Sequence, residues 1–358
     1  MELDIGVLSR AFGREVSSYT VEPIEPELRI HSVTGGVMRV RADGASLVIK
    51  IVRHGEDPDP NALWVSGADP SHRNFWKREW LAFSTGFLDA LPGELRAPRT
   101  LLTTENGPDE CWIWMEDVEG NPGTSFELDD YDSVAFDLAT TQAAFATGRS
   151  VLPGHEWLAH QWLRGWVAAL AHRMPDLEGE IWSDERLEAL VPLRPRLREL
   201  WSARETLLSI VETAPQTVVH CDFWPTNLIA ADDGTTVAVD WSQVGIGAIA
   251  QDLDQLILDP VWMQVLPGQS LVELETHVLR GYVSGLRTSG ADLSEAAVRR
   301  WYAAAASVHY APMLAFMASV AAAPERLERR WGRPFTVIAR DRARVIERAL
   351  ELGESVLG

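Results

Sequence analysis

The sequence predicts an α+β chain with two unequal parts: a small antiparallel sheet with one main helix, and a large, mostly helical part. Short alternating segments separated by Gly turns occupy residues 28–53, a pattern typical of antiparallel strands. Helical periodicity dominates from residue 132 onward and is interrupted by one strand-rich stretch, residues 218–240. A chain of 358 residues is long enough for two lobes that share a cleft.

Composition narrows the class of partner and the compartment. The formal net charge is −20, which disfavours nucleic acid because its phosphates would be repelled. The same charge is compatible with a cationic partner. Two cysteines, Cys111 and Cys221, do not make a disulfide framework, so a reducing compartment, the cytoplasm, is expected. The first residues show no basic run followed by an apolar core, so no signal peptide is expected.

The N-terminal elements follow from alternation and turn residues. We expect a short helix and a connector over residues 1–30, strands at 28–33, 37–42 and 46–53, and turns at 34–36 and 43–44. The third strand contains Lys50, although only two of the 32 basic residues are Lys. An ammonium buried in an apolar strand needs an anionic partner, and it can bind phosphate oxygens as a compact charge. The alternative is a Lys that faces solvent.

The middle and C-terminal elements are mostly helices. We expect a loop at 57–71, a helix over 75–87, strands at 101–102 and 111–115, and helices at 132–147, 156–173, 184–191, 194–213, 270–287, 293–321 and 335–352. The most apolar run, Trp301–Ala323, contains Pro312. We interpret it as a buried helix interrupted near the Pro, and expect no membrane partner.

An acidic stretch and a group of Trp residues between residues 101 and 201 are relevant to the kind of substrate that the chain could bind. Residues 101–148 contain eleven carboxylates and no Lys or Arg; they form either a solvated face or a negative rim that attracts a polycationic or amino-sugar substrate. Five Trp occur at helical spacings, which indicates core, although Trp faces can also stack on sugars or hold cations. These are Trp157, Trp162, Trp166, Trp182 and Trp201.

The polar groups with the clearest chemistry lie between two apolar segments near residue 220. His220, Asp222 and Asn227 follow a buried strand, and Asp240 ends the next one after the hairpin turn at 232–234. Such a hairpin brings Asn227 beside Asp240. Amide and carboxylate oxygens suit Mg²⁺, which usually binds one or two carboxylates together with substrate phosphates. The alternative is an ordinary loop pair and a turn cap.

These segments resemble a known family. His220–Asn227 and Val239–Trp241 are similar to the two signature blocks of the aminoglycoside phosphotransferase and choline kinase superfamily, small-molecule kinases with the bilobal protein-kinase fold. The similarity with motifs covers roughly residues 28–260. One departure is Cys221, where Gly is usual; we expect it to alter loop packing rather than chemistry.

The resemblance implies roles for the loop residues. Asn227 and Asp240 would hold Mg²⁺ across the phosphates of ATP. Asp222 would align the acceptor hydroxyl and take its proton, and His220 would organise the loop by hydrogen bonds. In a following segment, Gly245–Asp254, Asp252 is expected to cap a helix or to brace the catalytic loop.

The resemblance also implies a nucleotide site in the small lobe. Lys50 would steady the α and β phosphates, and Glu79, on the helix over 75–87, would pair with Lys50 or with a base on its own helix. Gly35 and Gly36 occupy the place of a Gly-rich phosphate loop, although an ordinary hairpin fits equally well.

A hinge between the lobes is implied at residues 116–120, separating an N-terminal nucleotide-binding lobe, 1–115, from a C-terminal catalytic and substrate-binding lobe, 121–358. There the carbonyl of Glu116 and the amide of Val118 would bind adenine.

The expected activity is ATP-dependent transfer of the γ-phosphoryl group to a hydroxyl of a small molecule, with an aminoglycoside or amino sugar first and an antibiotic-resistance role possible. Choline, a sugar or homoserine is the alternative acceptor. A nucleotide-binding scaffold without catalysis is the alternative class. The sequence does not fix the oligomeric state.

Overall fold

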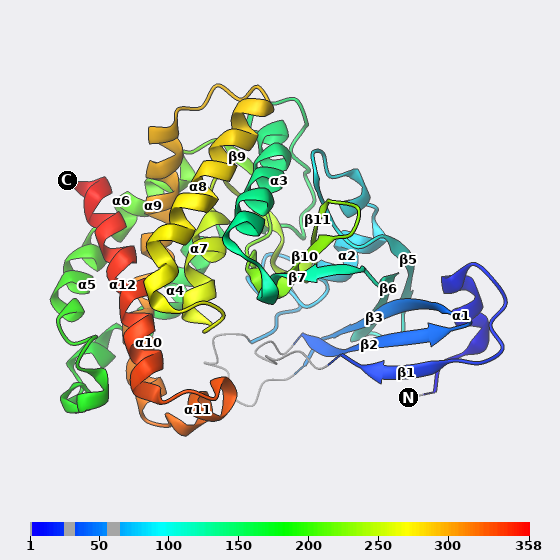
Figure 1. The fold of residues 1–358 in the computed structure, drawn as a ribbon, viewed down its shortest axis with the longest axis horizontal. Coiled ribbons are helices and arrows are strands. Elements are labelled where there is room, and N and C mark those ends of the chain that lie inside the picture. Colours follow the sequence, from blue (N-terminus) through cyan, green and yellow to red (C-terminus); the bar gives the residue numbers. More distant parts are fainter. Residues whose placement is uncertain (1, 25–32, 56–64) are drawn as a thin grey trace.

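The computed structural model describes residues 2–24, 33–55 and 65–358. Strands gather near the N-terminus and helices near the C-terminus, so the chain is an α+β protein with a sheet part and a helical part, as predicted (Figure 1). The largest sheet has the order β1-β2-β3-β6-β5 and is antiparallel throughout. Its strands are β1 Thr20–Pro23, β2 Thr34–Ala42, β3 Ala45–Arg53, β5 Thr100–Glu105 and β6 Glu110–Glu116.

The first strand of this sheet differs from the prediction. The sequence predicts a connector here, but Thr20–Pro23 forms β1 and pairs with β2. It is a short edge strand that ends in Pro, which lacks the N–H that an interior strand needs. The predicted strand at 28–33 lies outside the described residues except for Val33. The short helix is confirmed as α1, Ile5–Phe12, which Asp4 caps by accepting from the Val7 amide at 2.9 Å.

The predicted turn at 34–36 is wrong. Gly35 and Gly36 lie inside β2, where the register with β3 shifts between Thr34 and Gly36. A Cβ on Gly35 would stand 2.8 Å from Cγ2 of Ile51. The glycine pair therefore permits a bulge and a close strand contact rather than a reversal of the chain.

The helix of the sheet part is shorter than predicted. It is α2, Arg78–Ser84, instead of 75–87, because Phe75 forms a β-bridge with Gly67 and Trp76 lies in a turn before the helix. The strand pair β5–β6 around residues 106–108 agrees with the prediction. Part of the loop expected at 57–71 lies outside the described residues.

Two small sheets join the sheet part to the helices. One has the order β4-β11-β10-β7, with β4 Leu95–Arg96, β7 Gly120–Pro122, β10 Leu228–Ala231 and β11 Thr236–Ala238. The other has the order β8-β12-β9, with β8 Ala159–His160, β9 Gln216–Val219 and β12 Gly245–Ala248. The predicted hairpin is confirmed, since Leu228 pairs with Ala238.

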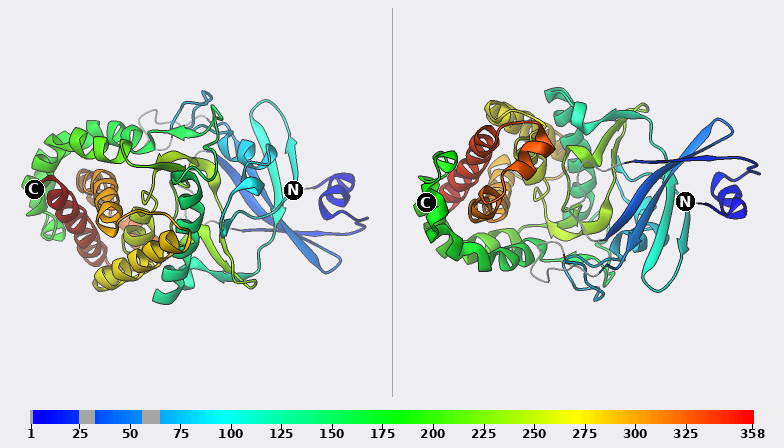
Figure 2. Two further views of the ribbon diagram at one scale, coloured as in Figure 1. Left: turned by 90° about the horizontal axis from the view of Figure 1, so that it is seen from above. Right: turned by 90° about the horizontal axis from the view of Figure 1, so that it is seen from below.

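Ten helices form the rest of the described fold. They are α3 Leu128–Ala146, α4 Trp162–Leu170, α5 Leu193–Ser202, α6 Arg204–Glu212, α7 Leu253–Trp262, α8 Leu271–Thr288, α9 Glu295–Tyr310, α10 Met313–Ala321, α11 Glu325–Trp331 and α12 Phe335–Leu357. The helix predicted at 184–191 is instead a series of tight turns, with a 3-10 segment at Glu185–Leu187. Figure 2 shows the C-terminal helices and the large sheet at opposite ends of the molecule.

One helical stretch is long and apolar enough to cross a membrane by composition alone. It is Glu295–Ala321, and 83% of its most apolar window is buried inside the protein. It consists of α9 and α10 separated near Pro312. This agrees with the predicted buried helix interrupted at the Pro.

Helices α3 and α8 pack at a very short distance because α8 carries glycines on the contact face. A Cβ on Gly281 would lie 2.0 Å from the carbonyl oxygen of Asp132, and one on Gly285 would lie 2.5 Å from that of Phe136. Backbone atoms cannot move aside as a flexible side chain could, so these positions exclude any larger residue.

We therefore expect Gly281→Ala to lower the free energy of unfolding by at least about 2 kcal/mol, as overpacked sites do. Urea denaturation monitored by circular dichroism measures this. Ser284→Ala, on the exposed face of the same helix, is the matched control and should change the unfolding free energy by less than about 0.5 kcal/mol. Equal stability of the two variants would contradict this packing.

Candidate active site

The loop after β9 is held by a carboxylate from a distant segment. Asp252 accepts hydrogen bonds from the amides of His220, at 3.0 Å, and Cys221, at 2.9 Å, and from the side chain of Gln142, at 3.0 Å. Its side chain makes no capping bond to α7. Of the two roles considered for Asp252, bracing the loop is therefore the one observed. Burial raises the pKa of Asp252 to about 7.

Cys221 occupies a backbone conformation that glycine adopts most easily. Its φ is +60°, in the left-handed region that costs other residues about 1–2 kcal/mol. The thiol is buried, and its sulfur accepts from Gln251 at 3.6 Å. The departure from Gly at this position is thus accommodated by strain and side-chain packing, as expected from its size.

The hairpin places the candidate metal ligands at one end of the loop. The side-chain amide of Asn227 donates to the carboxylate of Asp222 at 2.7 Å and to the backbone carbonyl of Asp222 at 2.9 Å. The Val239 amide donates to the Asn227 carbonyl at 2.9 Å, so Asn227 and Asp240 are brought together across the hairpin as predicted. Asp240 also adopts φ +60°, which turns the chain directly after the strand.

Lys50 connects the large sheet to this hairpin. Its Nζ lies 2.6 Å from Oε2 of Glu79 and 2.9 Å from Oδ1 of Asp240. Lys50 and Glu79 are buried, at 5% and 2% exposure. Lys50 is therefore not the solvent-facing strand residue considered as an alternative. Glu79 does not pair locally either, because Lys77 binds Glu105 and Arg78 binds backbone carbonyls.

Burial and neighbouring charges shift the pKa values of these groups. Burial lowers the pKa of Lys50, but Asp240 and Glu79 raise it by more, so the ammonium stays charged. Burial raises the pKa of Glu79 to about 7 in spite of Lys50. Burial, followed by the charges of Asp240 and Asp259, raises the pKa of Asp222 well above the usual range of a carboxyl. A raised pKa makes the Asp222 carboxylate a stronger proton acceptor than an exposed carboxylate.

His220 joins the loop to the hairpin. Its Nε2 lies 3.1 Å from the Val239 carbonyl, and its ring packs against Trp241 with centroids 4.5 Å apart. Burial lowers the pKa of His220 to about 4, so the ring is neutral at physiological pH and donates to that carbonyl. These contacts fit the predicted organising role.

Sequence reasoning missed Arg78. This fully buried side chain donates to the carbonyls of His72, Arg73, Trp157 and Ser242 at 2.8–3.2 Å. It thereby fixes the start of α2, and with it Glu79, to the helical part. The sequence around Arg78 does not indicate that its side chain is buried, because two of the carbonyls it binds, those of Trp157 and Ser242, are far away in the sequence.

A cleft of about 790 Å³ lies between the sheet part and the helical part. Its lining includes Lys50, Glu79, Asp222, Asn227 and Asp240. The candidate hinge residues Glu116 and Val118 also line it, beside Val37, Val48 and Met115. Among the described lining residues, Gly35 and Gly36 do not appear; β2 reaches the cleft through Val37 and Arg39.

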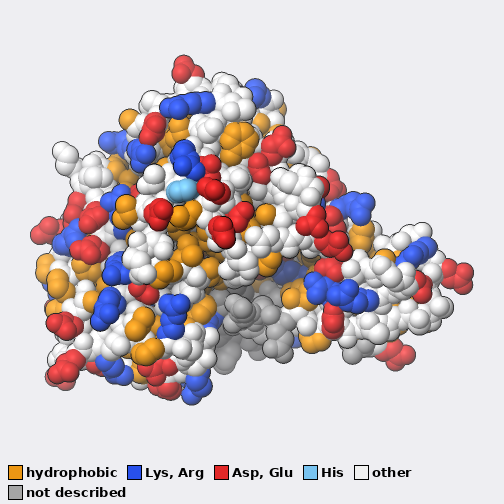
Figure 3. All heavy atoms as spheres, viewed as in Figure 1, with side chains coloured by type: hydrophobic (Ala, Val, Ile, Leu, Met, Phe, Trp, Pro, Cys, Tyr) orange, Lys and Arg blue, Asp and Glu red, His pale blue; other side chains and the backbone are white. Residues whose placement is uncertain are grey.

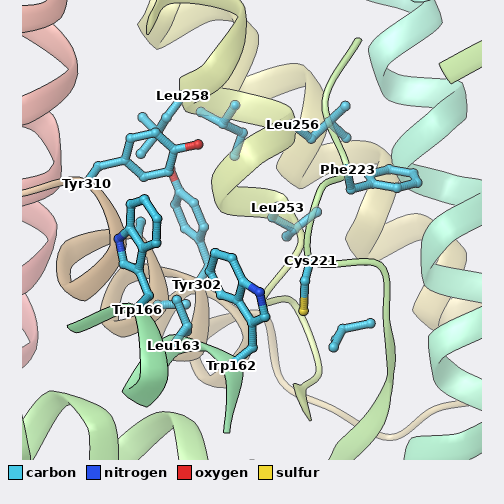
Figure 4. Close-up of a cluster of buried hydrophobic side chains, with 14 of the residues drawn as sticks. Trp162, Leu163, Trp166, Cys221, Phe223, Leu253, Leu256, Leu258, Tyr302 and Tyr310 are labelled. Atoms are coloured by element: carbon cyan, nitrogen blue, oxygen red, sulfur yellow. The ribbon is translucent and has the colours of Figure 1, made fainter. Parts of the chain in front are cut away.

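The far side of the cleft is lined by aromatic side chains. They are Trp162, Trp166, Trp262, Tyr310, Phe316 and Trp331. We call the region formed by these rings and by Arg173, Arg330, Arg342 and Asp259 the acceptor side. The rings of Trp162 and Trp166 are stacked, with centroids 5.6 Å apart, and lie in one group with Tyr310 (Figure 4). These two Trp thus belong to the core and also border the cleft, whereas Trp157 and Trp182 are buried away from it.

Two carboxylates of the acidic stretch, Glu116 and Asp117, line the cleft at the candidate hinge, whereas those around α3 have other partners. Glu127 and Asp130 form a capping box at the start of α3, Asp132 pairs with Arg280 at 3.0 Å, and Asp137 binds Thr236. On the face shown in Figure 3, positive and negative side chains are interspersed. The interpretation as a solvated loop and helix face therefore fits the carboxylates around α3.

The donor set fits a hard divalent ion shared with phosphates. Among the described residues, no cluster of three or more His, Cys, Asp or Glu side chains could hold a metal alone. Asn227 and Asp240 instead supply an amide oxygen and a carboxylate to the same cleft, which matches the way Mg²⁺ binds one or two protein ligands together with phosphate oxygens.

A small antiparallel sheet over a helical lobe, with these polar groups at the junction, is the architecture of the kinase-like phosphotransferases. The model of the phosphotransferase enzyme family matches residues 37–282, more than half of the chain. The chain therefore belongs to this family, which confirms the resemblance seen in its sequence.

Solved structures show the same fold at low sequence identity. A microcompartment-associated aminopropanol kinase is 14% identical with a TM-score of 0.53, over 99% of this chain and 98% of that one. A spectinomycin phosphotransferase in complex with ADP and spectinomycin is 12% identical with a TM-score of 0.52, over 99% and 97%. An amicoumacin kinase in complex with AMP-PNP, Ca²⁺ and Ami is 11% identical with a TM-score of 0.50, over 88% and 89%. No curated protein matches the chain.

The strained backbone at Cys221 gives a testable contrast. Cys221→Gly removes the left-handed strain but adds chain entropy to the unfolded state, so the unfolding free energy should change by less than about 1 kcal/mol. Cys221→Val places a β-branched residue at φ +60° and should lose about 2 kcal/mol or more. Guanidinium denaturation of both variants compares them, and a Val variant as stable as the Gly variant would refute the argument.

Proposed function

We propose that the chain is an ATP-dependent O-phosphotransferase that moves the γ-phosphoryl group to a hydroxyl of a small molecule. The observation that carries this proposal is the convergence of Lys50, Asp222, Asn227 and Asp240 on one cleft between the two parts of the molecule. We further propose residues 1–115 as the nucleotide-binding lobe, 116–120 as the hinge and 121–358 as the catalytic lobe.

The nucleotide would lie under the large sheet. Lys50, fixed by Glu79 and Asp240, would bind phosphate oxygens, and the backbone of Glu116 and Val118 would bind adenine. Asn227 and Asp240 would hold Mg²⁺, which neutralises phosphate charge when it is bound. Two of the solved structures of this fold contain AMP-PNP with Ca²⁺, or ADP, which supports a nucleotide in this position.

Asp222 is the proposed general base. The acceptor oxygen forms a bond to the γ-phosphorus while the bond from that phosphorus to the β,γ-bridging oxygen breaks, and ADP leaves. The proton of the acceptor hydroxyl passes to the Asp222 carboxylate. The hydrogen bond from Asn227 and the brace from Asp252 hold this carboxylate in position, which matters because phosphoryl transfer depends mostly on positioning and charge.

Substitution of the two aspartates should separate chemistry from binding. We expect Asp222→Ala to lower kcat by at least about 100-fold, the contribution of a general base, with nucleotide affinity retained. Asp240→Ala should lose metal-dependent ATP binding as well. Calorimetric titration with ATP and Mg²⁺, and mass spectrometry of phosphorylated products from an acceptor panel, measure the two effects.

Asp232→Ala, on the exposed turn of the same hairpin, is the matched control and should behave as wild type. Turnover of Asp222→Ala near the wild-type rate would remove Asp222 from its role. Tight ATP binding by the wild type without any phosphorylated product or acceptor-stimulated hydrolysis would favour the alternative, a nucleotide-binding scaffold.

A further inference from the structure

The acceptor side of the cleft carries more positive than negative charge. Its guanidinium groups are those of Arg173, Arg330 and Arg342, and its carboxylate is that of Asp259. The other carboxylates among the described lining residues belong to α2, the candidate hinge and the candidate catalytic loop and hairpin; they are Glu79, Glu116, Asp117, Asp222 and Asp240. This composition differs from the expectation of an amino-sugar acceptor, since a polycation would meet like charges here.

Arg342 is a buried cation without a matching anion. It is 4% exposed, and its polar contacts within the described structure are the Trp262 carbonyl at 3.3 Å and the Met317 sulfur at 3.6 Å. Its guanidinium lies over the Trp262 ring, 4.4 Å from the centroid. A buried charge is costly unless a counter-ion or several hydrogen bonds compensate it, and a carbonyl and a thioether supply only part of that compensation.

The neighbours of Arg342 increase its need for an anion. Burial, followed by the like charge of Arg330, lowers the pKa of Arg342 to about 9, so the group is still charged at neutral pH. Asp259 attracts it but interacts with His309 and the Tyr310 hydroxyl as well, and burial raises the pKa of Asp259 to about 7. A partly protonated carboxyl compensates only part of the charge of Arg342.

Arg173, in the 3-10 segment Ala171–Glu178, brings a second guanidinium to the lining of the same cleft. It lies over the ring of Phe316, 5.5 Å from the centroid, and its Nε is buried without a hydrogen-bond partner in the described structure. Arginine presents planar pairs of N–H donors that match a carboxylate or phosphate. Donors left open in an aromatic cleft are suited to an anionic group on an otherwise apolar ligand.

We propose that the acceptor is a hydroxylated compound with an aromatic or alicyclic body and a carboxylate, which Arg342 and Arg173 bind while the hydroxyl faces Asp222. This inference rests on the proposed kinase function and specifies its substrate class. The aromatic side chains of the acceptor side cover the body of the ligand, and the carboxylate replaces the missing counter-ion.

A matched set of probes tests the charge preference. The probes are a hydroxymethyl-naphthoate, its carboxamide and its aminomethyl analogue, which share one ring system and one hydroxyl. Calorimetric titration of the AMP-PNP-saturated protein should show the carboxylate binding about 10- to 100-fold tighter than the amide, as expected for charge-assisted hydrogen bonds. The amine should bind most weakly.

Variants assign the preference to the two arginines. Arg342→Met and Arg173→Gln should each remove most of the preference for carboxylate over amide, whereas Arg340→Gln, an exposed position on the same helix as Arg342, should keep it. Arg173→Gln decides the question if Arg342→Met does not fold. Equal binding of all three probes, preference for the amine, or no binding of any probe overturns the inference.

The outcome is separable from that of the proposed function. ATP titrated alone reports the nucleotide site independently of any acceptor. Normal, Asp240-dependent ATP binding without carboxylate preference would refute this inference and leave the kinase proposal intact. Loss of ATP binding in the wild type would refute the kinase proposal itself.

Discussion

The ion pairs of Lys50 are the interaction on which the rest of the cleft depends. One ammonium reaches Glu79 on α2 and Asp240 just after the β10–β11 hairpin, at 2.6 and 2.9 Å, so the sheet part, its helix and the helical part meet at a single buried charge. Burying Lys50 and Glu79 is unfavourable unless their charges are well paired. The arrangement therefore fixes the two parts relative to each other at the place where a triphosphate would lie. Arg78 adds a second attachment of the same helix through hydrogen bonds to four carbonyls.

Local spacing explains why the centre of the site could be predicted. Asp222, Asn227 and Asp240 are separated by one short loop and one tight hairpin, so their positions follow from the chain itself, and Lys50 stood out as a rare Lys in an apolar strand. Other features depend on contacts that local patterns do not encode. The edge strand Thr20–Pro23 exists because β2 offers it hydrogen bonds, and Gly35 is needed because Ile51 lies against it. Neither neighbour can be read from the segment alone.

Charge illustrates a second limit of sequence reasoning. Eleven carboxylates in residues 101–148 indicated either a solvated face or a negative rim, and their partners decide between these. The members on α3 are used for helix capping and for pairing with Arg280, which are tasks of the surface. The acceptor side instead carries three arginines, from Ala171–Glu178, α11 and α12, and the carboxylate of Asp259 on α7. Net charge, −20 for the chain, thus says little about the field inside one cleft, which a few buried groups dominate.

The family match covers the candidate catalytic residues but stops before the C-terminal helices that line the acceptor side. The family match ends at residue 282, within α8, and it includes every residue proposed to handle the nucleotide and the proton except Gly35 and Gly36. Phe316, Trp331 and Arg342 lie beyond it, on α10, α11 and α12. Because the transferred group is the same for every acceptor, the residues that handle it can stay constant while the helices that cover the acceptor change. The chemistry of this chain can therefore be inferred from its motifs, whereas its substrate must be inferred from Arg342 and the aromatic rings of the C-terminal helices.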